Sequence, residues 1–443
     1  MKRNLNSSLV FLFLIIMVAF IIRATCNRLD YMSEGAPDQY GYEASQIAGS
    51  VAAGHGFGNP YPLVPTGPTA LMPPAYIYLL AAIYKELGVQ TDASYIAATT
   101  LSGLFSALAC IPIFWLGRRV ANDAVGLCGA AFWAVFPSAV ILTTGPFAGV
   151  WDTALSMLLA ASVLAAVVQI RDTDRTRAWI GLGLLCALAL EVNPAIFSVL
   201  PFLFAWLVWQ LYQRRSKWLR LPAAAVLMIV LGCAPWALRN WVTFHHFIPF
   251  RSNFGLELWL GNNQFEDHDL FPDWRSPYNS WPEQARLTQI GETAFMQQKK
   301  AAAIKYIEAH PRQTVRSIYT RFAVIWTGLD VRVSAVWGGM SAATRTFYVI
   351  NLLLVICGWS GMWVMFRHGS PLAWPFLIYL VFYPAVYYIT HAQLRYRHPI
   401  DPALTVLSTF AVFCAARAVS RRFLGVSPPS SSAAEALPSP AAD

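Results

Sequence analysis

The stretch that decides how this chain is arranged across a membrane is Ala75–Leu87, with the sequence AYIYLLAAIYKEL. It is apolar, but it follows two prolines and is shorter than the roughly 20 residues that a straight spanning helix needs. If it spans, the short basic loops further along the chain alternate between the two sides of the membrane. If it lies at the interface, they all share one side, which the positive-inside rule favours. We therefore predict a half-inserted or surface helix on the outer face.

The decision between a spanning and an interfacial helix rests on the basic residues in the loops between the apolar stretches and at the two ends of the chain. Together with Lys2 and Arg3 at the N-terminus, they are Arg118 and Arg119; Arg171, Arg175 and Arg177; Arg214, Arg215, Lys217 and Arg220; Arg367; and Arg417, Arg421 and Arg422. Placing them all in the cytoplasm predicts a multi-pass protein of the cell (inner) membrane with both termini cytoplasmic.

The composition indicates lipid as the main solvent of this chain. Of its 443 residues 56% are hydrophobic and 12% are charged, against about 25% charged in a typical soluble domain. The net charge of +9 raises nucleic acid as a partner. The basic residues lie between apolar runs, however, and form no patch interleaved with base-stacking aromatics. We therefore exclude nucleic acid and expect membrane lipid as a partner.

Ten apolar stretches predict an all-α bundle of about ten transmembrane helices. The first stretch follows Met1-Lys2-Arg3 without a small-x-small cleavage site, so we predict an uncleaved helix and not a signal peptide. The ten are Leu9–Ile22, Ile96–Leu116, Ala124–Leu142, Thr153–Ile170, Ala178–Leu190, Ala195–Leu211, Leu221–Leu238, Phe347–Phe366, Leu372–Ile389 and Ala403–Ala418.

These spans predict one transmembrane domain, residues 1–424, with two large outer loops at about 23–95 and 239–345. The second loop contains Ile318–Gly328, which is short, basic and aromatic and is predicted to be a second interfacial helix. Residues 425–443 are rich in Pro, Ser and Ala, which predicts a disordered tail. The seven cysteines form no CxxC pair, so we expect neither a disulfide framework nor a zinc site.

The distribution of polar residues places the working surface at the outer membrane–water interface. A transporter carries special polar residues at mid-membrane, often in broken helices and with an internal repeat. Here the spans are nearly free of charge, and no repeat is found. The polar, aromatic, glycine-rich and proline-rich sequence is concentrated in the outer loops.

The first outer loop holds the pattern with the most chemical content: PDQYGYE at 37–43, GHGF at 54–57 and PPAY at 73–76. Asp38 stands before a helix-like stretch, where an aspartate also suits the helix N-cap. The glycines around His55 allow the backbone to approach a ligand closely, or they form a simple turn.

This loop resembles that of GT-C-type glycosyltransferases, in particular the family of protein O-mannosyltransferases and the lipid A aminoarabinose transferase (bacterial glycosyltransferase family 39-like). The resemblance implies a GT-C-like fold. It also implies that Asp38 is catalytic, and that Tyr42, His55 and Tyr76 belong to the substrate site.

Two positions depart from the family pattern. Gln39 stands where the family often has a second acidic residue. Met72 stands where the aminoarabinose transferases have a lysine that helps to hold the lipid phosphate. These departures argue against modification of lipid A and leave the phosphate anchor open.

Two further acidic residues are predicted near the outer face. Asp152, in GVWDTAL (149–155), stands at the outer start of the fourth span, where an acidic residue recurs in this family; it also suits a helix N-cap. Glu191 lies in the turn between the fifth and sixth spans at a similar depth. It either contacts substrate or belongs to a solvated turn.

RYRHPIDP (395–402) resembles the same region of many bacterial members of the family. Two arginines in a short outer loop violate the charge rule, so a compensating anion is expected, and guanidinium groups bind phosphate oxygens with several donors. We assign Arg395 and Arg397 to the polyprenyl phosphate; pairing with lipid head groups or with Asp401 is the alternative. Residues 235–263 also resemble bacterial members, without an assigned role.

No cofactor is predicted. Glu266, Asp267, His268 and Asp269 are residue types that bind divalent ions, but a polar loop is the favoured interpretation. The chain contains no Walker A loop, no Rossmann fingerprint and no HExxH motif.

Together these features predict an inverting membrane glycosyltransferase that moves a sugar from a polyprenyl-phosphate donor to an acceptor hydroxyl at the outer face. Asp38 accepts the proton, the arginines stabilise the departing phosphate, and Asp152 orients the sugar or supports Asp38. The acceptor can be a protein, a lipid or a glycan. The alternatives are a lipid-linked-sugar flippase or transporter without transferase activity, and a transferase that uses a lipid pyrophosphate donor.

Overall fold

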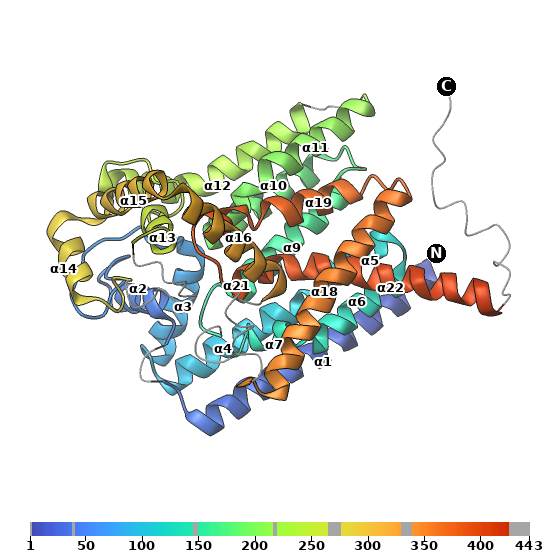
Figure 1. Ribbon diagram of the computed structural model, residues 1–443, viewed down its shortest axis with the longest axis horizontal. Coiled ribbons are helices and arrows are strands. Elements are labelled where there is room, and N and C mark those ends of the chain that lie inside the picture. Colours follow the sequence, from blue (N-terminus) through green and yellow to red (C-terminus); the bar gives the residue numbers. More distant parts are fainter. Residues whose placement is uncertain are drawn as a thin grey trace.

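The computed structural model describes residues 2–37, 40–144, 149–215, 219–264, 276–328 and 339–424. Throughout these ranges the named elements are helices (Figure 1). The predicted all-α architecture is confirmed.

Each of the ten predicted stretches is occupied by helix. The helices of this bundle are α1 (Lys2–Glu34), α4 (Asp92–Leu108), α5 (Cys110–Val120), α6 (Asp123–Val135), α7 (Pro137–Ile141), α9 (Thr153–Ile170), α10 (Thr176–Val192), α11 (Leu200–Gln213), α12 (Arg220–Phe244), α18 (Ala342–Arg367), α19 (Ala373–Phe382), α20 (Ala385–Ile389) and α22 (Asp401–Leu424). Six segments of the described chain are long and apolar enough to cross a membrane: Leu5–Glu34, Asp92–Val120, Thr153–Ile170, Arg220–Phe244, Ala342–Arg367 and Leu394–Ser420.

Helix α1 is longer than the sequence predicts, because Arg23 does not open the outer loop. The Arg23 side chain is fully buried and donates to Ser106 Oγ at 2.7 Å, to the Ala134 carbonyl at 3.0 Å and to the Trp133 carbonyl at 3.1 Å. A buried guanidinium is tolerated where its donors find acceptors. The helix therefore continues to Glu34.

The basic loops that were predicted to share one side gather at one end of the bundle. Arg118 pairs with Asp123 at 3.2 Å, and Ser8 near the start of α1 donates to the same carboxylate at 2.8 Å. Arg119 forms an ion pair with Asp172, which joins the α5–α6 loop to the α9–α10 loop. The N-terminal end of α1 and the C-terminal end of α22 also lie together at the right of Figure 1. The cytoplasmic assignment of this end stays a prediction.

A second group of helices forms a lobe at the opposite end, at the left of Figure 1. The lobe has its own apolar core and consists of α2 (Tyr42–Ala52), α3 (Pro74–Leu87), α13 (Phe254–Gly261), α14 (Trp281–Ile290) and α15 (Glu292–Ala309). Helix α3, which contains Ala75–Leu87, packs on α2, α4 and α10. It buries Ile77, Leu80 and Tyr84 and exposes Tyr78. The stretch is therefore a short helix of the lobe.

The second predicted interfacial stretch, Ile318–Gly328, lies largely within α16 (Pro311–Thr327). One face of α16 packs toward α18 and α20 and buries Val324 and Ile325. The other face exposes Tyr319 and Phe322. An aromatic face next to a buried face is typical of a helix at a membrane surface.

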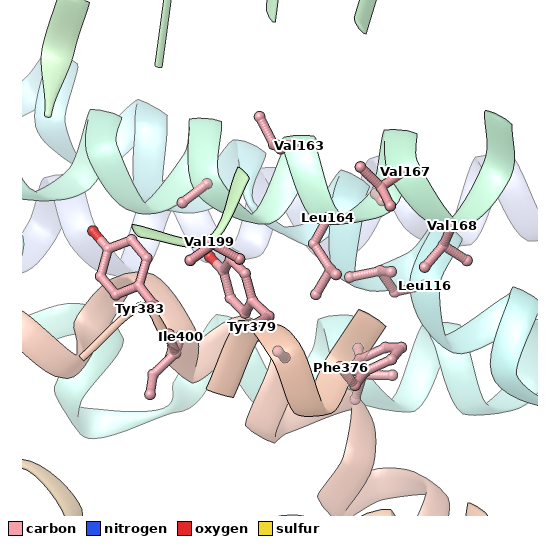
Figure 2. Packing of buried hydrophobic residues seen from close by; sticks show 14 of the residues in the cluster. Leu116, Val163, Leu164, Val167, Val168, Val199, Phe376, Tyr379, Tyr383 and Ile400 are labelled. Atoms are coloured by element: carbon pink, nitrogen blue, oxygen red, sulfur yellow. The ribbon is translucent and has the colours of Figure 1, made fainter. Parts of the chain in front are cut away.

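Helix α9 is the centre of the bundle. It is apolar around its whole circumference, which is typical of a helix surrounded by other helices. Figure 2 shows Leu164 and Val168 of α9 on the side of Leu116 (α5) and Phe376 (α19), with Val163 and Val167 on the other side of the helix. Because α9 is fixed on all sides, the residues at its N-terminus have a fixed position at the end of the bundle that meets the lobe.

Candidate functional site

A cavity of about 320 Å³ lies where the lobe meets the bundle. Its wall is built from segments far apart in the sequence: α2, the residues before α9, the turn after α10, the α12–α13 connection, α13, and the region around α21 (Leu394–Arg397). The acidic, basic and histidine side chains in the described wall are Glu43, Asp152, Arg251, Glu257, His391 and Arg395.

Asp152 stands at the N-cap position of α9, but its side chain makes no capping hydrogen bond. It accepts instead from Ser156 Oγ at 3.1 Å and from Asn193 Nδ2 at 3.3 Å. The residue is 6% exposed and lines the cavity. The Asp152 carboxylate is thus held at the cavity wall by one side chain of α9 and by one side chain from the turn after α10.

The charge state of Asp152 depends on its surroundings. Burial raises the pKa of Asp152 above its ordinary value, while Arg251, the hydrogen bond from Ser156 and then Arg395 oppose that rise. A carboxyl whose pKa is raised holds a proton more readily than an exposed one. Removal of either arginine would raise the pKa further.

Two arginines face the cavity from different segments. The Arg395 guanidinium lies over the Trp151 ring, 5.2 Å from its centroid, and 5.3 Å from the Tyr396 ring centroid. Arg251 Nη2 lies 3.6 Å from Glu257 Oε1. The stacking of Arg395 on aromatic rings keeps its donors directed, which suits the binding of an anion.

Glu257 is held ionised by its neighbours. Its Oε2 lies 3.1 Å from His391 Nδ1, and Asn253 Nδ2 donates to its Oε1 at 2.5 Å. Burial opposes ionisation, but His391, Arg251 and Arg395 hold the pKa of Glu257 below its ordinary value. Nε2 of His391 is 2.8 Å from the Tyr396 hydroxyl. A ring held at both nitrogens has a fixed orientation.

Asp38 lies outside the described residues. The chain nearby is described: Gly41 lies so close to Val150 that a Cβ at Gly41 would stand 3.1 Å from the Val150 carbonyl oxygen. Gly41 follows Asp38 by three residues, and Val150 precedes Asp152 by two. The loop that carries Asp38 is therefore packed, at Gly41, against the segment that leads into Asp152.

Tyr42 and Tyr76 lie beside the cavity and do not line it. The Tyr42 ring packs edge-on against Trp151, with centroids 6.0 Å apart, and thus supports a residue of the cavity wall. Tyr76 is buried in α3. Burial and, after it, the negative charge of Asp152 raise the pKa of Tyr76, so its hydroxyl stays protonated near that carboxyl.

His55 and Glu191 occupy other places. His55 is exposed and lines a second hollow on the lobe. Glu191 is buried at the end of α10, beside Cys233 of α12. It is absent from the described cavity wall, which instead contains Asn193 from the same turn.

Arg397 is fully buried and is absent from the described cavity wall. Its Nε donates to Asp401 Oδ1 at 2.7 Å, and Nη2 donates to Asn351. The structure therefore places Arg397 in the pairing with Asp401 that the sequence left as an alternative. Arg23 and Arg397 both lie just outside the predicted spans, and the structure buries both guanidinium groups between helices.

Sequence reasoning missed Arg251, Glu257, His391, Glu43 and Asn193 as site residues. Four of these five residues lie in sequence segments that had already been singled out. Arg251 and Glu257 lie in the 235–263 block, Glu43 ends the PDQYGYE motif, and Asn193 is in the turn that suggested Glu191. What the sequence did not show is that these segments meet.

The acidic cluster at 266–269 lies outside the described residues. Among the described residues, no group of three or more His, Cys, Asp or Glu side chains is arranged to hold a metal ion.

Comparison with known families gives one match in sequence. Residues 71–238 match the family model described as dolichyl-phosphate-mannose-protein mannosyltransferase. The matched segment contains Met72, Asp152 and Asn193, and it ends before Arg251 and Arg395. Among curated proteins no sequence matches the chain.

Comparison with solved structures shows the fold. The oligosaccharyltransferase of Archaeoglobus fulgidus tethered to an acceptor peptide has a TM-score of 0.58 at 13% identity over 94% of this chain and 50% of its own. The same enzyme, AglB, with an inhibitory peptide and a dolichol-phosphate has a TM-score of 0.53 at 15% identity, over 96% and 52%. This chain thus spans about half the length of that enzyme. ArnT from Cupriavidus metallidurans, bound to undecaprenyl phosphate, superimposes more loosely, with a TM-score of 0.36 at 14% identity over 95% and 81%.

Proposed function

We propose that this chain is an inverting membrane glycosyltransferase. The proposal is supported by the match of residues 71–238 to the dolichyl-phosphate-mannose-protein mannosyltransferase family model and by the fold shared with the archaeal oligosaccharyltransferase. The chain transfers a sugar from a polyprenyl-phosphate donor to an acceptor hydroxyl at the outer face of the cell (inner) membrane. Both termini lie in the cytoplasm, and the cavity opens on the opposite side.

The observation that carries this proposal is the cavity at the junction of lobe and bundle. Its wall holds two arginines together with carboxylates, which is the combination of groups that transfer from a phosphate donor requires. The dolichol-phosphate seen with the archaeal oligosaccharyltransferase supports a lipid phosphate as the anion here.

Arg395 and Arg251 are the proposed phosphate ligands. As the bond from the anomeric carbon to the phosphate oxygen breaks, negative charge develops on the phosphate, and fixed guanidinium donors stabilise it. Met72 lines the cavity and carries no charge. The two arginines are therefore proposed to bind the lipid phosphate in place of the lysine that the aminoarabinose transferases have at this position. Arg251 replaces Arg397 in this assignment, because Arg397 is engaged with Asp401.

Asp38 is the proposed base. It accepts the proton of the acceptor hydroxyl while the hydroxyl oxygen bonds to the anomeric carbon from the face opposite the phosphate, which inverts that centre. Asp152, held by Ser156 and Asn193, orients the sugar within the cavity. Tyr42 and Tyr76 support the wall behind Trp151 and Asp152.

The test is transfer from a radiolabelled polyprenyl-phosphate hexose in membranes that contain the wild-type chain, Arg395→Gln or the matched surface variant Arg286→Gln. We expect transfer by wild type and by Arg286→Gln, and strongly reduced transfer by Arg395→Gln at equal expression. Movement of labelled donor across the membrane without formation of a glycosylated product would contradict the proposal and favour a flippase. Transfer from a polyprenyl-pyrophosphate donor alone would favour the pyrophosphate class.

A further inference from the structure

One carboxylate outside the cavity holds two segments of the cavity wall together. Glu292 is the first residue of α15, is 7% exposed and is absent from the described cavity wall. Its Oε1 accepts from the Ser252 hydroxyl at 2.6 Å and from the Ala70 backbone N–H at 2.9 Å, and its Oε2 accepts from the Thr69 hydroxyl. A single side chain therefore joins the segment before α3 to the connection between α12 and α13.

These two segments are also bonded to each other and to the bundle. The Ser252 backbone N–H donates to the Ala70 carbonyl at 2.8 Å. Arg239, near the end of the bundle helix α12, donates to the Thr69 carbonyl at 2.7 Å. The segment before α3 is thus fixed to the lobe through α15 and to the bundle through α12.

Both segments continue directly into the cavity wall. The residues beside the hydrogen-bonded ones are Leu71, Met72 and Arg251, and all three line the cavity. Consecutive Cα atoms are about 3.8 Å apart across a planar peptide unit, so a residue that is held in place restricts the position of its neighbour. The bonds to Ser252 therefore restrict where the Arg251 side chain begins.

The contacts of the Arg251 guanidinium itself are loose. Its Nε is buried without a hydrogen-bond partner among the described residues, and its Nη2 lies 3.6 Å from Glu257 Oε1, which is longer than a hydrogen bond. Arg251 is nevertheless the neighbour that lowers the pKa of Asp152 most. The place of this charge at the cavity wall therefore depends on how the backbone of Arg251 is held.

A carboxylate makes this link firmer than a neutral group would. Burial raises the pKa of Glu292 above its ordinary value, and the hydrogen bonds that it accepts, first that from Ser252, oppose the rise. Hydrogen bonds to an ionised acceptor are shorter and stronger than those to a neutral one, and they make the burial of the charge tolerable.

We propose that Glu292 is a positioning residue of the transferase: by holding Ser252 against the segment before α3, it keeps the Arg251 guanidinium at the cavity wall, where it binds the lipid phosphate. The role of Arg251 toward phosphate rests on the proposed function. Glu292 contacts neither donor nor acceptor and acts through Arg251.

The test is a double-mutant cycle on phosphate binding. The purified full-length chain in detergent is titrated with geranylgeranyl phosphate, which carries the charged group that departs in the reaction, and with geranylgeraniol as the uncharged control. We expect Glu292→Ala to weaken phosphate binding about fivefold and Arg251→Gln about tenfold, and the double variant to bind like Arg251→Gln alone. A residue that only stabilised the fold would lower the melting temperature without this coupling.

Three further variants separate positioning from folding. Ser252→Ala removes one hydroxyl and should weaken phosphate binding about twofold, with no effect in the Arg251→Gln background. Glu292→Gln keeps an oxygen that can accept from Ser252 and Ala70, so it should recover most of the binding that Glu292→Ala loses. Glu308→Ala removes an exposed carboxylate of the same helix and should bind like wild type. If Glu292→Ala does not fold, Ser252→Ala decides.

The positioning role is contradicted if folded Glu292→Ala and Ser252→Ala bind the phosphate as tightly as wild type, or if Glu292→Ala weakens binding equally with and without Arg251. If wild type binds the alcohol as tightly as the phosphate, the phosphate site is wrong and the positioning role falls with it. A chain that shows the coupling but transfers no sugar supports the role of Glu292 and contradicts the transferase.

Discussion

The cavity and the hollow have similar volumes, about 320 Å³ and 280 Å³, and both use one face of α2, yet their chemistry is opposite. The cavity wall contains three carboxylates, two guanidinium groups and an imidazole. The described lining of the hollow carries neutral amides and hydroxyls, with His55 as its imidazole. Charge is therefore concentrated where a phosphate is proposed to leave, and the described lining of the hollow is neutral. One helix thus contributes to a charged and to a neutral concavity, so residue types near α2 do not by themselves locate the reaction.

The largest effect on sugar transfer is expected from the replacement of Asp38. This variant tests whether the reaction takes place at the cavity and not at the hollow. Asp38→Asn should lower transfer by about 10² to 10⁴-fold, because a proton acceptor is removed. The measurement is transfer from radiolabelled donor at equal expression, with Glu86→Gln on the exposed face of α3 as control. Full activity of that variant would refute the assignment of the base.

The next largest effect is expected on the stability of the fold. It tests whether Arg397 belongs to a buried ion pair or to the phosphate site of the cavity. Arg397→Leu removes the arginine that pairs with buried Asp401 and leaves His398 Nδ1, 3.3 Å away, as its remaining contact of this kind among the described residues, so it should destabilise the fold by about 3–5 kcal/mol. The double variant Arg397→Leu/Asp401→Leu removes both charges and should recover much of that loss. Thermal melting in detergent measures both. If Arg397→Leu melts like wild type but loses transfer, Arg397 belongs to the phosphate site after all.

Arg395→Gln is expected to lower kcat about a hundredfold, since one fixed donor for the departing phosphate is lost. Its melting temperature should stay close to that of wild type. Arg251→Gln should act in the same direction, and Arg286→Gln should not. Unchanged kcat with a raised KM would show instead that Arg395 binds the donor equally in the ground state and the transition state.

The smallest effect is a shift in pH dependence. Burial raises the pKa of Asp152, so activity that needs ionised Asp152 falls on the acid side at a higher pH than for an exposed aspartate. Arg251 and Arg395 lower this pKa, so Arg395→Gln should move the acid limb to higher pH by about one unit at most. Relative rates across the pH range measure the shift. An identical acid limb in Asp152→Asn would show that another group sets it.

The hydrophobic pattern determined most of the fold. Ten apolar stretches predicted ten helical segments. The short stretch Ala75–Leu87 predicted a helix that does not belong to the bundle of long helices. The reason is that apolar runs and charged loops are local properties of the sequence, and they determine which segments enter the membrane and on which side the loops lie. The end of α1 was missed because Arg23 carries a charge, and a single sequence does not show that the carbonyls of Trp133 and Ala134 accept its donors.

The sequence by itself determined the residue types of the site: Asp152 at the start of α9, the arginines of RYRHPIDP, and the motifs of the first outer loop. Only the tertiary structure decided which of them share a cavity. Arg395 and Arg397 are two residues apart, yet one faces the cavity and the other is buried against Asp401. Arg251 and Glu257 are far from both in the sequence, but they join Arg395 at the cavity wall. Side-chain direction depends on helix packing, and packing depends on contacts between distant segments, which no local pattern contains.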